Sequence, residues 1–346
     1  MKSTQPPDTV VLVEAEIQKC SPVLNSGLRW NDESHTWGKP GSAWRRLQAG
    51  FCRHLNAWRL GLIPVFVLMT SACSSVSIIN GITPRSGYTL NADLPYGESP
   101  RLKLDVYVPE KAETPAPVVV FFYGGNWRSG ERGEYRFLAA SLATRGILVV
   151  VPDYRLYPEV EYPAFLQDSA HAVAWTLREV VKYGGDPHRV FVMGHSAGAY
   201  NAAMMAYDPR WLAAEKLSPT ALAGFIGLAG PYNFLPIESP DTKPVFDWPN
   251  TQPSTQPITH VTAAAPHALM IAPGKDKVVD PEQNTERMAE QLRKNNIGVE
   301  VKRYDSLNHY TTAGVFAWPL RWLAPVLKDV TEFVKAPTGI QSHVGS

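Results

Sequence analysis

One short segment, residues 189–207, constrains the fold of this chain more than any other. Residues 189–193 read R-V-F-V-M, an apolar run with the length of a buried strand, and residues 199–207 are rich in small side chains that suit a closely packed helix. The pentapeptide G-H-S-A-G lies between them at residues 194–198. A serine in such a strand-to-helix turn has its hydroxyl exposed at the top of the sheet, and flanking glycines allow strand and helix to approach closely. The segment therefore predicts an α/β fold with Ser196 as a nucleophile.

Strand-like and helix-like segments alternate along most of the chain. The expected strands are residues 102–109, 117–123, 147–152, 189–195, 223–229, 267–272 and 298–304. The expected helices are residues 133–145, 163–183, 197–207, 281–295 and 319–335. Such alternation favours a mostly parallel central sheet with helices on both faces. Residues 235–266 lack either pattern because prolines interrupt them every few positions, so this insert is either a small cap over the site or an edge loop.

A serine nucleophile needs a histidine that accepts its proton. His309 lies just beyond the expected strand at residues 298–304, in a loop that leaves the carboxyl end of that strand. Parallel sheets place their chemistry at these ends, so we expect His309 to be the base. His195 precedes the nucleophile on its strand, and strand alternation places its side chain on the opposite side.

The histidine in turn needs a carboxylate that orients it. Asp276 is the first acidic residue after the expected strand at residues 267–272, and we expect it to be this acid. Asp280 is followed by Pro281, which is more typical of a helix N-cap with proline at the first helical position. The chain order Ser, Asp, His, each after its own strand, is typical of a serine hydrolase on this kind of sheet.

A second glycine-containing turn follows the continuous apolar run at residues 118–122. It reads Y-G-G-N-W at residues 123–127, and glycines there allow backbone N–H groups to approach a tetrahedral intermediate closely. The N–H of Ala197, at the start of the helix after the nucleophile, is a further donor. Taken alone the turn is a plain Gly-Gly turn, but beside a serine nucleophile it predicts an oxyanion hole.

These motifs together resemble the α/β-hydrolase superfamily, and most closely its bacterial carboxylesterase and lipase branch, which carries an H-G-G-x-W oxyanion loop and G-H-S-A-G. The resemblance covers roughly residues 102–334 and includes D-Y-R-L at residues 153–156. It implies a catalytic triad of Ser196, Asp276 and His309, with oxyanion donors at Gly125, Asn126 and Ala197. Tyr123 departs from the pattern, because it stands where the branch has a histidine that mostly supports the loop. We expect Asp153 and Arg155 to form a structural ion pair.

The segment before these motifs resembles the precursor of a bacterial lipoprotein. Four arginines between residues 45 and 59 precede a short apolar run at residues 60–69, which small residues and Cys73 follow. This order is typical of a secretory signal that ends in a lipobox, so we expect lipid on Cys73. Ser74 after that cysteine implies passage to the outer membrane of the bacterial cell envelope. A buried or membrane-spanning apolar segment is the alternative interpretation.

The predicted organisation follows from these boundaries. Residues 1–72 are an N-terminal extension with the signal segment, residues 73–95 a polar tether, residues 96–336 the catalytic domain and residues 337–346 a C-terminal tail. The other two cysteines, Cys20 and Cys52, lie upstream of Cys73, so the mature domain is expected to have no disulfide.

Composition excludes several other classes of function. The chain has 33 Lys and Arg against 32 Asp and Glu, so it indicates no basic face for nucleic acid. It has neither a P-loop motif nor a Cys/His ligand cluster, and we expect no metal or cofactor. The expected function is a serine carboxylesterase that hydrolyses small acyl esters. Alternatives are an amidase or formamidase, or an acetyl or feruloyl esterase, of the same fold; a non-catalytic envelope binding protein is the alternative from another class.

Overall fold

The computed structural model describes residues 75–336 of the 346-residue chain. Backbone contacts divide the chain into two units, Met1–Ser75 and Val76–Ser346, and the second unit contains the central sheet. The extension and signal segment expected at residues 1–72, the lipidation site Cys73 and the tail at residues 337–346 lie outside the described residues. No helix within residues 75–336 has the length and apolar character needed to cross a bilayer.

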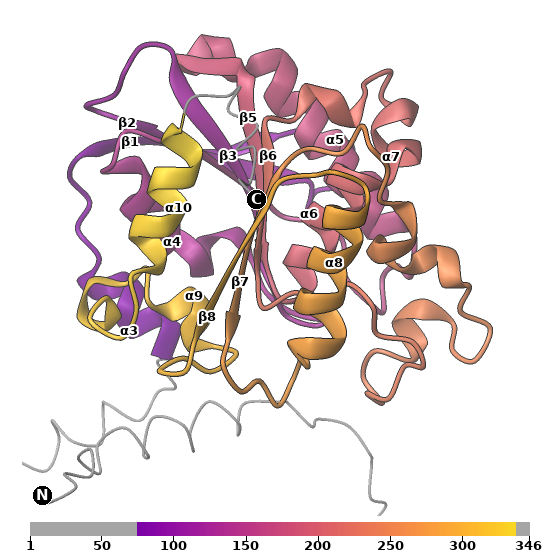
Figure 1. Cartoon of the computed structure of the whole chain (residues 1–346). Coiled ribbons are helices and arrows are strands. Elements are labelled where there is room, and N and C mark those ends of the chain that lie inside the picture. The colour runs from indigo at the N-terminus through magenta and orange to yellow at the C-terminus, as the bar shows by residue number, and fades with distance from the viewer. Residues whose placement is uncertain (1–74, 337–346) are drawn as a thin grey trace, which may run out of the picture. The chain divides into compact units, whose positions relative to one another are not determined.

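An eight-stranded sheet forms the centre of this unit, in the order β1-β2-β4-β3-β5-β6-β7-β8 (Figure 1). The strands are β1 (Tyr88–Pro95), β2 (Lys103–Pro109), β3 (Ala116–Phe122), β4 (Leu148–Pro152), β5 (Gly185–His195), β6 (Gly224–Leu228), β7 (Ala268–Pro273) and β8 (Val299–Tyr304). The β1–β2 and β2–β4 pairs are antiparallel and the other pairs are parallel. Every residue of β3, β4, β6 and β7 is buried, as expected of strands covered on both faces.

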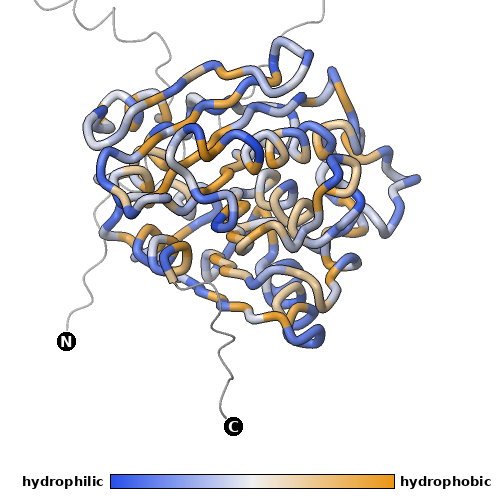
Figure 2. Tube along the Cα trace, turned by 90° about the horizontal axis from the view of Figure 1, so that it is seen from above, coloured by the Kyte–Doolittle hydropathy of each residue, from blue (hydrophilic) through white to orange (hydrophobic). Residues whose placement is uncertain are grey.

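Helices cover both faces of the sheet (Figure 1). On one face lie α4 (Arg136–Ala143) and α10 (Val326–Lys335), which contact each other. On the other lie α5 (Ala164–Glu179), α6 (Ala197–Tyr207), α7 (Pro209–Ala214) and α8 (Arg287–Lys294). Two shorter helices are α3 (Ser75–Ile82) and α9 (Thr311–Gly314). Seen from above, apolar segments gather toward the centre and hydrophilic ones lie mostly at the periphery (Figure 2).

The described part of the expected tether at residues 73–95 is folded, so the expected domain boundary at residue 96 is wrong. Tyr88–Pro95 forms β1, which pairs with β2 along the edge of the sheet. The amide of Asn80 in α3 donates to the backbone carbonyls of Gly133 and Glu134. In β1 only Tyr88 is buried, and its residues Y-T-L-N-A-D-L-P alternate between apolar and polar, a strand pattern without the continuous apolar run of the buried strands.

The last helix is also shorter than the expected residues 319–335. It begins at Val326, directly after Pro325, and a 3₁₀ turn at Trp318–Leu320 lies where the expected helix would start. Proline has no N–H to donate within a helix, so Pro325 cannot lie in the interior of a regular helix. Apolar periodicity therefore predicted a helix that starts several residues before its actual first residue, Val326.

Candidate active site

The strand-to-helix turn around Ser196 has the strained geometry that its sequence predicts. Ser196 joins β5 to α6 with φ 53° and ψ −123°, a left-handed conformation that costs free energy for a residue with a side chain. A Cβ atom added to Gly194 would lie 2.1 Å from the carbonyl oxygen of Gly198. A Cβ added to Gly198 would lie 2.1 Å from the carbonyl oxygen of Phe122. Both glycines are therefore needed for β5, β3 and α6 to meet this closely.

Ser196, His309 and Asp276 form one continuous hydrogen-bonded line. The Nε2 of His309 lies 2.9 Å from the Oγ of Ser196, and the Nδ1 of His309 lies 2.8 Å from the Oδ2 of Asp276. A carboxylate only accepts hydrogen bonds, so Nδ1 carries the proton and Nε2 is free to accept one from the serine hydroxyl. The structure thus brings together the three residues that the sequence assigned to a triad, from loops after β5, β7 and β8.

Asp276 is held in its ionised form by several donors. Burial of its carboxyl opposes ionisation, but the hydrogen bond from His309 and two backbone N–H groups outweigh it and lower the pKa of Asp276 below its usual value. Those N–H groups belong to Val278 and Val279, which donate to Oδ1 at 2.8 and 3.1 Å. Asp280, in contrast, accepts from the N–H of Glu282 at 2.8 Å and has the position of an N-cap.

The glycine-containing turn after β3 lies directly against Ser196. A Cβ added to Gly124 would lie 3.1 Å from the Cβ of Ser196. Gly125 has φ +125° and its carbonyl accepts from the N–H of Ser129, which closes a tight turn. Among the described residues, no backbone carbonyl accepts from the N–H of Gly125 or of Asn126. Ala197 is the first residue of α6, so its N–H has no partner within the helix. These three N–H groups are therefore available to an oxyanion.

A charged cluster that the sequence did not indicate anchors this turn. The Tyr123 hydroxyl donates to Oδ1 of Asp153 at 3.0 Å, and the backbone N–H of Arg132 donates to the same atom at 2.8 Å. Asp153 therefore ties together both ends of residues 123–132, which carry the N–H groups of Gly125 and Asn126. Arg101 adds a second clamp, because its Nη2 donates to the Tyr123 hydroxyl at 3.1 Å and to the carbonyl of Gly130 at 2.7 Å.

The expected ion pair between Asp153 and Arg155 is wrong. Asp153 pairs with the guanidinium of Arg132, which also donates to Asp105 at 2.9 Å. Arg155 pairs instead with the buried carboxylate of Asp168 on α5, at 2.7 Å. The two pairs are 21 and 13 residues apart along the chain, whereas Asp153 and Arg155 are separated by a single residue, so proximity along the chain pointed to the wrong partners.

Strand alternation predicted that the His195 side chain points away from the site, and this prediction is wrong. Its Nε2 lies 2.9 Å from the carbonyl oxygen of His309, and the two rings are 5.1 Å apart. Burial, together with the neighbouring His309, lowers the pKa of His195 to about 3. The ring is therefore neutral, and because a carbonyl only accepts, Nε2 is its donor. Alternation fails here because Ser196 leaves the extended conformation immediately after His195.

The insert at residues 235–266 packs against the glycine-containing turn at residues 123–127 rather than along a free edge. Its backbone forms three short 3₁₀ turns. The ring of Phe246 meets Trp127 edge-on at 4.8 Å, and the carbonyl of Thr255 accepts from the Tyr200 hydroxyl at 2.8 Å. Trp127 is itself fixed by a hydrogen bond from its Nε1 to Asn201 at 2.9 Å. Of the two arrangements expected for the insert, these contacts favour the small cap.

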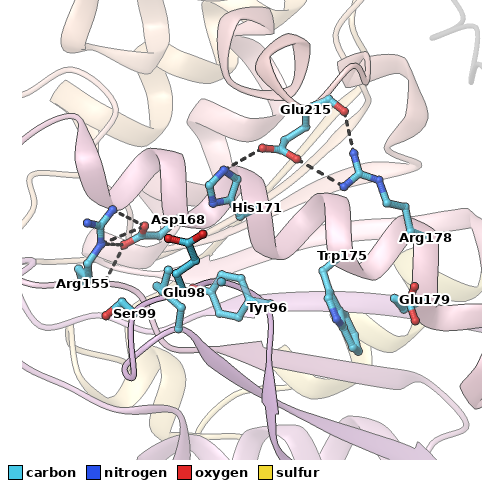
Figure 3. Close-up of a pocket in the computed structure, with 12 residues that line it drawn as sticks. Tyr96, Glu98, Ser99, Arg155, Asp168, His171, Trp175, Arg178, Glu179 and Glu215 are labelled. Carbon is cyan, nitrogen blue, oxygen red and sulfur yellow. Dashed lines mark hydrogen bonds and ion pairs between the residues drawn. The ribbon is translucent and has the colours of Figure 1, made fainter.

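A separate surface hollow of about 670 Å³ lies between the β1–β2 loop and α5, and no triad residue lines it (Figure 3). Arg155 there pairs with Asp168, and the Glu215 carboxylate pairs with both His171 and Arg178. The guanidinium groups of Arg155 and Arg178 thus already have carboxylate partners and are not free to bind an anionic ligand. Within residues 75–336 no cluster of three His, Cys, Asp or Glu side chains is placed to hold a metal ion.

The profile of the BD-FAE family matches residues 104–292, which is more than half of the chain. The chain belongs to the BD-FAE family. The matched residues include the turn at residues 123–127, Ser196 and Asp276, whereas His309 lies beyond them.

Curated relatives of this BD-FAE protein match over part of their length. A probable isoprenylcysteine alpha-carbonyl methylesterase of Oryza sativa is 36% identical over 40% of this chain and 34% of its own. Esterase LipC of Mycobacterium tuberculosis is 31% identical over 57% of this chain and 54% of its own. A kynurenine formamidase of Danio rerio is 32% identical over 42% of this chain and 48% of its own. The chain thus spans between a third and somewhat over half of the length of these relatives.

Solved structures confirm the α/β-hydrolase fold of this BD-FAE protein. An esterase of the archaeon Pyrobaculum calidifontis superposes with a TM-score of 0.62 at 22% identity, over 76% of this chain and 90% of that one. A truncated carbohydrate esterase from gut microbiota superposes with a TM-score of 0.59 at 18% identity, over 73% of this chain and 97% of that one. At these identities the likeness concerns the fold alone.

Proposed function

We propose that the protein is a serine carboxylesterase that hydrolyses small acyl esters through an acyl-enzyme on Ser196. The observation that carries the proposal is the hydrogen-bonded line from the Ser196 hydroxyl through His309 to Asp276, with distances of 2.9 and 2.8 Å. The esterases among the relatives support a carboxylic ester hydrolase. The intact line, next to three unoccupied N–H donors, disfavours a non-catalytic binding protein.

In the acylation step, the Oγ of Ser196 attacks the ester carbonyl carbon while its proton moves to Nε2 of His309. The imidazolium that forms is stabilised by the ionised Asp276, which also keeps the ring in the tautomer that accepts this proton. The carbonyl oxygen becomes an oxyanion, and the N–H groups of Gly125, Asn126 and Ala197 donate to it; each such donor contributes roughly 2.7–4 kcal/mol. The intermediate collapses when Nε2 returns its proton to the leaving alkoxide, which departs as the alcohol.

In the deacylation step, the same groups act on water. His309 takes a proton from a water molecule, whose oxygen attacks the acyl carbon bound to Oγ. The second tetrahedral intermediate occupies the same N–H donors. It breaks its bond to Oγ as Nε2 returns the proton to Ser196, so the enzyme is regenerated and the carboxylic acid is released.

The structure of the cap supports the proposed preference for short acyl groups. The insert at residues 235–266 is built of 3₁₀ turns anchored on Trp127 and Tyr200, and it contains no amphipathic α-helix of the kind that opens on lipid. A cap fixed in this way suits short acyl groups. A second candidate is hydrolysis of a formyl amide, which the kynurenine formamidase among the relatives favours and which the same triad can perform.

The proposed location is the bacterial cell envelope. The lipobox-like order of arginines, a short apolar run at residues 60–69, small residues and Cys73 supports cleavage before that cysteine and lipid on it. Ser74 supports transfer to the outer membrane. An enzyme tethered there on the periplasmic side would act on esters that have entered the envelope.

The proposal is tested with a panel of chromogenic acyl esters and one formyl amide, assayed on the full chain and on Ser196→Ala. We expect turnover of short esters by the wild type, loss of activity in the variant, and labelling of Ser196 alone by a fluorophosphonate probe. Unchanged far-ultraviolet circular dichroism of the variant is the control for folding. Activity that survives in Ser196→Ala would exclude the serine mechanism, and faster turnover of the amide than of every ester would favour the formamidase.

A further inference from the structure

Four large apolar side chains are exposed on two segments of the domain. Ile78 and Ile82 on α3 are 57% and 47% exposed, and Trp318 and Trp322 in the loop after α9 are 57% and 76% exposed. Single exposed apolar residues are common, but tryptophan is rarely so open to solvent in a soluble domain. We call these four side chains the Trp–Ile surface.

Both segments are anchored on the same helix, α4. On α3, the Asn80 side chain accepts from the backbone N–H of Phe137, the second residue of α4. One helical turn further, Ser141 donates to the carbonyl of Phe316 and accepts from the guanidinium of Arg321, both in the loop after α9. Residues four apart lie on the same side of a helix, about 6 Å from each other. The two segments are therefore neighbours, as they appear at the lower left of Figure 1.

The Trp–Ile surface is also close to the catalytic machinery. His309 leads within two residues into α9, and the chain reaches Trp318 four residues after that helix ends. Val315 and Phe316, between α9 and Trp318, are completely buried and hold this short connection in the core. The loop that presents the tryptophans is thus a rigid continuation of the loop that presents the catalytic base.

The chain itself indicates what covers this surface. The helix α3, which carries Ile78 and Ile82, begins at Ser75, two positions after Cys73. If Cys73 carries lipid, the first helix of the domain starts within two residues of the bilayer surface. Tryptophan is the residue that membrane proteins concentrate at the boundary between headgroups and acyl chains, because its ring is apolar and its N–H is polar.

We propose that the Trp–Ile surface rests on a lipid bilayer and fixes the orientation of the catalytic domain on the membrane. The inference rests on the proposed lipid anchor at Cys73, and it is independent of the proposed chemistry at Ser196. A lipid anchor alone leaves a domain free to rotate, whereas a second apolar contact next to the anchor removes that freedom. The loop of His309 would then be held at a constant height above the headgroups.

The test uses tryptophan fluorescence of the full chain, expressed with its signal and reconstituted in vesicles of phosphatidylethanolamine and phosphatidylglycerol. One set of vesicles carries bromine on the acyl chains, which quenches only tryptophans that enter the bilayer. Trp318 and Trp322 are two of the six tryptophans that follow Cys73. We expect brominated lipid to quench roughly a third of the emission of the mature protein, and we expect the double variant W318F/W322F to lose this quenching.

The matched control is Trp211→Phe, on α7, which lies across the sheet from α4 (Figure 1). It should still be quenched, now by roughly two fifths, because Trp318 and Trp322 are two of its five remaining tryptophans. Quenching that persists in W318F/W322F, or protein that sediments with vesicles without any quenching, would overturn the proposal and leave only a flexible tether. Lipid-free dimers that W318E/W322E dissociates would also overturn it, in favour of a second copy as the partner. Ser196→Ala should be quenched like the wild type, so failure of the esterase proposal is distinguishable.

Discussion

The Nε2 of His195 lies 2.9 Å from the carbonyl oxygen of His309, so the residue before Ser196 supports the loop that carries His309. His195 is neutral, with a pKa lowered to about 3 from its ordinary 6.5 by burial and by His309. The unfolded chain therefore binds one more proton than the folded protein between these two pH values. By linkage, the folded state loses stability as the pH falls through this range.

The first prediction concerns His195→Gln, whose amide can still donate to the His309 carbonyl but cannot take up a proton. Between pH 7 and pH 5, the wild type should lose about 2 kcal/mol more unfolding free energy than the variant. Urea unfolding at the two pH values measures this difference. Equal losses in both proteins would show that His195 is not buried in neutral form.

The second prediction compares Asp276→Asn with Asp280→Asn. The first should lower kcat/KM for a short chromogenic ester by roughly 10³–10⁴-fold, because an amide favours the wrong tautomer of His309. The second should change kcat/KM less than about twofold, since asparagine caps helices as well as aspartate does. If Asp280→Asn proved the more damaging, the orienting acid would have to be reassigned to that residue.

The third prediction is that Tyr123→Phe loosens the oxyanion turn. It removes the hydroxyl that donates to Asp153 and accepts from Arg101. Leaving buried polar partners unsatisfied should cost about 1–3 kcal/mol of unfolding free energy. We expect kcat to fall by about tenfold with little change in KM, since the turn acts on the transition state. Tyr183→Phe, on a ring that packs against Trp175, is the control, and a change confined to KM would contradict this role.

The fourth prediction concerns acyl-chain length. Because 3₁₀ turns anchored on Trp127 and Tyr200 form the cap, kcat/KM should be highest for acetyl to butyryl esters and fall for octanoyl and longer ones. The rate should show no jump when the substrate passes its solubility limit. Nitrophenyl esters of increasing length measure both properties. A steady rise with chain length would mean that the cap opens.

The fifth prediction is that Cys73→Ser separates location from catalysis. Hydrolysis of a soluble ester should be unchanged, while the activity moves from the membrane fraction to the soluble fraction or the precursor stays uncleaved. Several acyl chains anchor stably where one alone does not, so loss of the lipidated cysteine should have a large effect. Cell fractionation of wild type and variant, with Cys52→Ser as the control, measures it. A wild-type protein found unmodified in the cytoplasm would contradict the anchor.

Much of the fold and the main features of the site could be predicted from the sequence. The parallel strands are continuous apolar runs, such as β3, because both their faces are covered. The sequence predicted that Ser196, Asp276 and His309 lie together, because each follows its own strand in a fixed order and such strands end at one edge of the sheet. Local pattern and chain order were sufficient for these residues.

The rest depends on relationships that local pattern does not contain. The edge strand β1 reads Y-T-L-N-A-D-L-P and has only Tyr88 buried, so it lacks the continuous apolar run by which the buried strands were recognised. Asp153 pairs with Arg132 rather than Arg155. It directly follows β4, and β4 and the turn after β3 come together only when the sheet folds. The orientation of the His195 side chain depends on the residue at which β5 ends and the turn begins, and regular strand alternation does not identify that residue.

Asp153 holds the turn at residues 123–132 through both the Tyr123 hydroxyl and the Arg132 backbone N–H, and this has a consequence for the rate of the proposed reaction. The backbone dipoles at Gly125 and Asn126 take their orientation when the protein folds and keep it before any ester arrives. Water around a developing oxyanion must reorient at every event, whereas dipoles fixed in this way need not move. The entropy of ordering the turn is therefore lost once in the lifetime of each molecule, and not at each turnover.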